Sequence, residues 1–160
     1  MLARTILAAA TILAVPSAAF AQASPHCNPG GVCKVDVDVA GGKPCTDQAN
    51  ITVRPDTVIM GPGGQRMIVW TLPGAYRFCP ANGDGIVFKT SELDFQFFDG
   101  ARTDDADGTD DHGPPDRCRK HFRWKNKNEP FTAQRFYQYL VKFTGPAGEA
   151  CVKDPFIRNG

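Results

Sequence analysis

Apolar and polar residues alternate with a period of two along most of the chain. In residues 32–39, one face would carry Cys33, Val35, Val37 and Val39, and the other Lys34, Asp36 and Asp38. Such alternation predicts a strand with one buried face. Comparable stretches predict further strands at residues 50–60, 66–72, 86–89, 93–98, 117–128, 136–143 and 151–158. We expect residues 50–60 and 66–72 to form a hairpin, because Gly61-Pro62-Gly63-Gly64 between them is a turn signal.

No segment after the N-terminus shows a sustained helical period. The chain contains 13 prolines and 16 glycines, which divide it into short segments. About seven or eight short strands at this spacing are typical of an all-β sandwich. The sequence therefore predicts an all-β fold with little or no helix.

The first 21 residues have the organisation of a secretory signal peptide. Arg4 supplies the positive charge, residues 6–15 are apolar, and Pro16 precedes the small-residue cleavage site Ala19-Phe20-Ala21. No later apolar run is long enough to span a bilayer. We expect residues 1–21 to be removed and residues 22–160 to form a single domain that is secreted or periplasmic.

All six cysteines lie after the predicted cleavage site, where an oxidising compartment favours disulfides. Six cysteines allow fifteen connectivities, and the sequence does not select one. Local geometry favours Cys27–Cys33 across a turn and Cys79–Cys118 at the base of an acidic stretch, which leaves Cys45–Cys151. There is no C-x-x-C pair, so the cysteines are predicted to be structural.

The C-terminal strands resemble a known family. The run Tyr137-Gln138-Tyr139-Leu140-Val141-Lys142-Phe143, followed by a Gly/Pro turn and Asp154-Pro155-Phe156-Ile157-Arg158-Asn159, resembles the end of cupredoxin-like sandwich domains in uncharacterised exported bacterial proteins. The resemblance covers about the last 25 residues. It implies a Greek-key β-sandwich, cupredoxin-like or Ig-like, and no particular activity. The copper-ligand order is absent, because neither His nor Met follows Cys151.

Acidic residues dominate residues 99–116, which we expect to be a long loop. Carboxylates on a flexible, glycine-containing backbone suit Ca²⁺, and a histidine among them also allows Cu²⁺ or Zn²⁺. The candidate metal ligands are Asp104, Asp105, Asp107, Asp110, Asp111 and His112. The spacing does not match an EF-hand, and the alternative is a solvated loop kept extended by charge repulsion. The main expectation is that no cofactor is bound.

Basic residues dominate the next strand, residues 117–128. Its alternation places Arg119, His121, Arg123, Lys125 and Lys127 on one face. This stripe could contact an anionic envelope component or an acidic protein. Nucleic acid is not expected, because the aromatic Phe122 and Trp124 lie on the opposite face and could not stack on bases. Two alternatives remain open: the stripe protects a sheet edge, or it pairs with the acidic loop.

No catalytic set can be assembled from the residues present. Ser24 and Ser91 are the only serines after the signal, and neither lies in a G-x-S-x-G motif. Glu92 and Asp94 could form a hydrolytic acid/base pair only if a cleft lay beside them. We therefore expect an exported non-catalytic binding module of an envelope-associated or inhibitor-like type. The alternatives are a metal-binding periplasmic protein and, less favoured, a hydrolytic enzyme.

Overall fold

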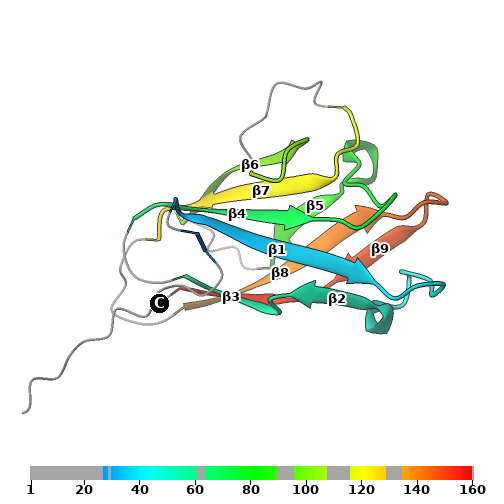
Figure 1. The fold of residues 1–160 in the computed structure, drawn as a ribbon, viewed down its shortest axis with the longest axis horizontal. Coiled ribbons are helices and arrows are strands. Elements are labelled where there is room, and N and C mark those ends of the chain that lie inside the picture. Colours follow the sequence, from blue (N-terminus) through cyan, green and yellow to red (C-terminus); the bar gives the residue numbers. More distant parts are fainter. Residues whose placement is uncertain are drawn as a thin grey trace, which may run out of the picture.

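The computed structural model is an all-β sandwich of two sheets (Figure 1). It describes residues 27–28, 30–60, 64–89, 96–107, 116–128 and 135–159, so the predicted signal peptide lies outside the described residues. Those residues form ten strands and two 3₁₀ helices, Gln48–Asn50 and Pro80–Asn82. Within the same ranges, no helix has the length and apolar character needed to cross a membrane.

The first sheet has the strand order β2-β1-β4-β7-β6. These strands are β1 (Val32–Val39), β2 (Ile51–Arg54), β4 (Arg66–Thr71), β6 (Phe97–Thr103) and β7 (His121–Asn126). The β1 and β4 strands run parallel, and the other neighbours are antiparallel. The alternation in β1 directs Val35 and Val37 into the core, where they are 0% and 1% exposed. The predicted buried face of this strand is confirmed.

The second sheet has the order β3-β10-β8-β5, and β9 also pairs with β8. Its strands are β3 (Thr57–Met60), β5 (Gly85–Phe88), β8 (Arg135–Thr144), β9 (Ala150–Lys153) and β10 (Phe156–Asn159). The register on β8 continues from β9 to β10, because Val141 pairs with Lys153 and Gln138 pairs with Phe156. Pro155 therefore interrupts what is otherwise one strand beside β8.

The expected hairpin between residues 50–60 and 66–72 is wrong. The first of these stretches divides at Pro55, and β2 remains in the first sheet while β3 pairs with β10 in the second. The β4 strand lies between β1 and β7. A glycine-rich turn signals a reversal of the chain, but the partners of a strand depend on which sheet can bury its apolar face.

The expected loop at residues 99–116 also begins too early. Its first residues continue β6 as far as Thr103, with a register irregularity between Phe98 and Ala101. Asp99 adopts a left-handed φ of 57° at this irregularity. A β-bulge of this kind re-aims side chains near a sheet edge.

Aromatic side chains fill the space between the sheets. Trp70 from β4 meets Tyr139 from β8 edge-to-face, and Phe88 from β5 packs on Phe97 from β6. Trp70 and Tyr139 are both 0% exposed. These contacts connect the two sheets through the centre of the core.

Two side chains of the first sheet also reach the edge strand of the second. Trp124 Nε1 donates to the carbonyl of Ile86 at 3.1 Å, and Arg102 Nη2 donates to the carbonyl of Asp84 at 2.7 Å. These hydrogen bonds satisfy carbonyls at and just before β5, which protects an edge that would otherwise present open acceptors.

Three disulfides join Cys27 to Cys33, Cys45 to Cys151 and Cys79 to Cys118. These are the pairs that the spacing favoured. Cys45–Cys151 connects the segment before β2 to β9 and links residues 106 positions apart. Cys79–Cys118 connects the approach to β5 with the approach to β7.

Candidate functional site

The candidate site lies on the outer face of the first sheet, away from the aromatic core. Cross-strand pairing places Val69 of β4 beside Arg123 of β7, and Thr71 beside His121. Alternation along β7 directs Phe122 into the core, so His121, Arg123 and Lys125 project from the opposite face. Arg119 and Lys127 continue the same alternation on either side. We call Arg119, Arg123 and Lys125, together with the His121 imidazole that stands among them, the cation layer.

Most of the cation layer is buried. The exposed fractions of Arg119, His121 and Arg123 are 4%, 6% and 4%, and Val69 beneath them is 0% exposed. Val69 does not belong to the apolar core cluster, so its burial shows that this outer face is covered. Cationic side chains are rarely buried unless they are paired, so the groups that cover them are expected to carry negative charge.

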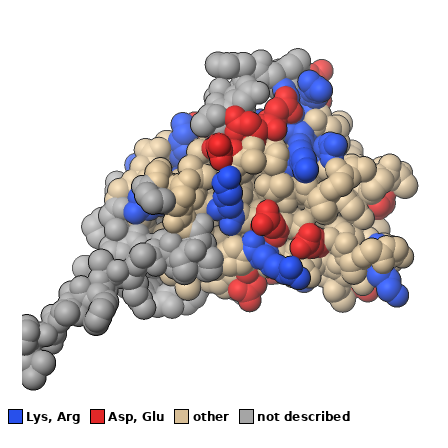
Figure 2. Space-filling model, in the orientation of Figure 1, with Lys and Arg blue, Asp and Glu red and all other residues tan. Residues whose placement is uncertain are grey.

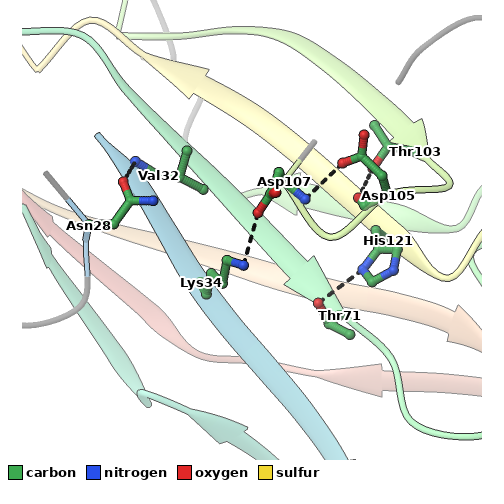
Figure 3. A network of polar contacts seen from close by, with 8 residues as sticks. All are labelled: Asn28, Val32, Lys34, Thr71, Thr103, Asp105, Asp107 and His121. Carbon is green, nitrogen blue, oxygen red and sulfur yellow. Dashed lines mark hydrogen bonds and ion pairs between the residues drawn. The ribbon is translucent and has the colours of Figure 1, made fainter. Parts of the chain in front are cut away.

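Part of the cover is the chain that follows β6, residues 104–107, here called the acidic segment. The Thr103 hydroxyl donates to the Asp105 carbonyl at 3.1 Å, and the Asp107 N–H donates to the Asp105 carboxylate at 2.7 Å (Figure 3). Asp107 forms an ion pair with Lys34 of β1 at 2.9 Å. Because β7 and β4 lie between β6 and β1 in the sheet, this ion pair joins the acidic segment to a strand three positions away.

Ion pairs join the acidic residues to the cation layer. Arg119 pairs with Asp104 at the start of the acidic segment. Asp99, at the β6 irregularity, lies 2.6 Å from Lys125 Nζ and 3.6 Å from Arg123 Nη2. The hydrogen bond from Lys125 and the positive charge of Arg123 lower the pKa of Asp99 below its usual range. Among the described residues of this face, acidic side chains consequently stand next to basic ones (Figure 2).

His121 lies between Arg119 and Arg123 in the cation layer, opposite Thr71 of β4. Its Nδ1 is hydrogen bonded to the Thr71 hydroxyl at 3.0 Å. Burial lowers the pKa of His121, and the nearby positive charges of Lys120, Lys34 and Arg77 lower it further, against the opposing effect of Asp105. These effects favour the neutral form of the His121 imidazole.

The expected metal ligands fall into two groups. Asp110, Asp111 and His112 lie outside the described residues. Asp104 and Asp107 pair with Arg119 and Lys34, and Asp105 accepts the Asp107 N–H. A cation at these three aspartates would have to replace existing contacts, so metal binding by the acidic stretch stays a prediction.

A second potential ligand set is formed by Cys45, Glu149 and Cys151. Their sulfur and carboxylate atoms lie within 4.8 Å of one another. The two sulfurs are bonded to each other in a disulfide. Only the Glu149 carboxylate is then available as a strong ligand, and it already accepts the Ala147 N–H at 2.9 Å. The oxidised protein thus offers no thiolate at this position.

The basic stripe expected from the sequence is present, but it is less accessible than the alternation suggested. Lys127 is exposed, Lys125 is half-buried, and the other three members are buried. The sequence did not identify Thr71 as a partner of the stripe or Lys34 as a partner of Asp107. Cross-strand pairing brings Thr71 to His121, and the chain that turns back after β6 brings Asp107 to Lys34. Both contacts join residues far apart in the sequence, so no local pattern predicts them. Ser91, Glu92 and Asp94 lie outside the described residues.

Comparisons with protein-family models, curated proteins and solved structures find no match to this chain. The resemblance of the closing strands to cupredoxin-like domains accordingly stays a prediction.

Proposed function

We propose that the protein is a non-catalytic binding module that acts outside the cytoplasm and holds an anionic partner on the cation layer of β7. The proposal includes removal of residues 1–21 and release into the periplasm or the medium. One observation carries it: cationic side chains stand in one row on an outer sheet face, and exposed carboxylates cover them. The Asp99 and Asp104 side chains are 45% and 46% exposed, whereas those of Arg119 and Arg123 are 5% exposed.

This arrangement favours an anionic partner over an apolar one. A buried guanidinium without a counter-charge is strongly unfavourable, so anything that displaces Asp99 or Asp104 must supply negative charge. The row also offers partial access from solvent at Lys125, whose side chain is 30% exposed. The three disulfides support the extracytoplasmic assignment, since such bonds persist in oxidising compartments.

A matched pair of double variants tests the surface. Lys125→Gln with Lys127→Gln removes two charges from the β7 face, and Lys43→Gln with Lys142→Gln removes two charges elsewhere. On a carboxylate cation-exchange matrix, we expect the β7 variant to elute at clearly lower salt than the control variant. Equal elution of the two variants would show that retention depends on net charge alone and would remove the support for this surface.

The export part has its own test. N-terminal sequencing of the protein recovered outside the cytoplasm should begin at Gln22. Recovery of the unprocessed chain in the cytoplasm would contradict this part of the proposal without bearing on the binding surface.

A further inference from the structure

We infer that the acidic segment is a built-in competitor for the cation layer, and that an acidic peptide binds this face by displacing it. The inference rests on the proposed function, because it concerns the same surface. It adds the chemical class of the partner and a form of self-inhibition within the chain.

The contact that holds the far end of the acidic segment is polar and lies near solvent. The Asp107 side chain is 69% exposed and its partner Lys34 is 54% exposed. Ala106, which lies between the paired aspartates, is also exposed. Ion pairs between exposed side chains are weak and are screened by salt. Nothing apolar within residues 104–107 anchors the segment to the sheet.

The surface under the segment is suited to an exchange of anions. Arg119 is buried and pairs with Asp104, and His121 and Thr71 satisfy each other nearby. Moving the segment away would leave Arg119 and Lys34 without these carboxylates. Another chain that brought carboxylates to the same two positions would restore both ion pairs.

Asp99 differs from the acidic segment because it belongs to β6. It is held in a paired strand at the register irregularity and keeps its contacts with Arg123 and Lys125 when residues 104–107 move. The exchangeable carboxylates are therefore those of Asp104 and Asp107, which are three residues apart. This spacing indicates a partner that is itself an acidic peptide segment, because such a segment reproduces the existing contacts residue for residue.

The test uses the oxidised mature protein and a fluorescent, acetylated and amidated peptide Thr-Asp-Asp-Ala-Asp, the sequence of residues 103–107. In Asp104→Asn with Asp107→Asn, the internal competitor loses its charge. We expect this variant to bind the peptide about fivefold or more tightly than the unmodified protein in low salt, because a larger fraction of the molecules has a free surface. The single variant Asp107→Asn should shift affinity in the same direction, and its exposed position leaves the fold intact.

The control is Asp36→Asn with Asp38→Asn, which removes two exposed carboxylates from β1 and changes net charge equally. Equal tightening in this control and in both segment variants overturns the inference, because the gain would then follow from net charge. Binding of a soluble polyuronate in place of the peptide overturns the peptide assignment. If the β7 lysine variants lose matrix retention but the segment variants gain no affinity, the proposed function stands and the inference fails. If no form binds any anion, both fail.

Discussion

Trp70 Nε1 donates a hydrogen bond to the Tyr139 hydroxyl at 3.2 Å in the centre of the core. The two residues come from different sheets, β4 and β8, and both are fully buried. Burial raises the pKa of the Tyr139 hydroxyl, so it remains protonated at any ordinary pH. The pair supplies a directional link between the two sheets in the middle of their apolar packing.

Replacing Tyr139 by Phe should destabilise the protein by about 1–3 kcal/mol, because the indole N–H of Trp70 would be left buried without an acceptor. Urea unfolding of the oxidised protein measures the change. Tyr76→Phe is the control, since Tyr76 is half-buried and meets Phe143 edge-to-face through its ring. Equal losses in the two variants would contradict a specific role for the Trp70–Tyr139 hydrogen bond.

Acidification should destabilise the fold through His121. Its pKa in the folded protein lies below the unfolded value of about 6.5. The unfolded state therefore binds more protons as the pH falls, and stability present above pH 6.5 is lost down to the folded pKa. The slope from this one group cannot exceed about 1.4 kcal/mol per pH unit.

His121→Gln should reduce this pH dependence, since glutamine retains a polar partner for Thr71 and does not titrate. Urea unfolding at about pH 7.5 and about pH 5 provides the comparison, with His26→Gln as the control. If the pH dependence of stability were unchanged in His121→Gln but reduced in His26→Gln, the effect would belong to His26 and the role given to His121 would be contradicted.

Gly100 is the position where a single methyl group should disturb the irregularity in β6. A Cβ at this residue would lie 2.6 Å from Cζ2 of the Trp124 ring. The indole would have to move, which would weaken its hydrogen bond to the Ile86 carbonyl. We expect Gly100→Ala to cost about 1–3 kcal/mol in the free energy of unfolding.

Gly41→Ala provides the control for this substitution, because a Cβ there meets nothing within 4 Å. Its effect should stay within about 0.5 kcal/mol. A larger loss of stability in Gly41→Ala than in Gly100→Ala would contradict this prediction. It would show that β6 tolerates a side chain against Trp124.

The disulfides should differ in their contribution according to the length of chain that each closes. Cys45–Cys151 spans 106 positions and Cys27–Cys33 spans 6. The chain-entropy relation gives the longer loop an advantage of about 2.5 kcal/mol. Unfolding of the double-serine variants should therefore show the larger loss for Cys45 with Cys151. A larger loss for the short loop would indicate that contacts around Cys27 outweigh chain entropy.

Local sequence was sufficient where the structure depends on local alternation. The pattern of Val35 and Val37 against Asp36 and Asp38 predicted both the strand β1 and its buried face. It could not predict that β1 runs parallel to β4, because that pairing joins distant stretches of chain. The acidic composition after Phe98 also concealed the end of β6, since Asp99 and Gly100 are poor strand formers.

For the candidate site, the sequence predicted which basic residues share one face, but it did not predict that most of them are buried. Alternation placed Arg119, His121 and Arg123 on one face, as the structure has them. Their cover depends on Asp99 at the β6 irregularity and on residues 104–107 folding back over the sheet, and the sequence carries no local sign of either placement. The alternative in which the stripe pairs with the acidic stretch describes the ion pairs of Arg119 and Arg123 better than an open surface does.

The two long sides of the sandwich are joined in different ways. On one side the chain itself passes from β2 into β3 at Pro55, and Cys45–Cys151 lies near the same strands. On the other side, β5 and β6 meet through packed aromatic rings and through hydrogen bonds from Arg102 and Trp124. The first side is therefore joined covalently, and the second only by non-covalent contacts. Under mechanical load or partial unfolding, the two sheets should separate first at β6, the strand from which the acidic segment leaves the sheet.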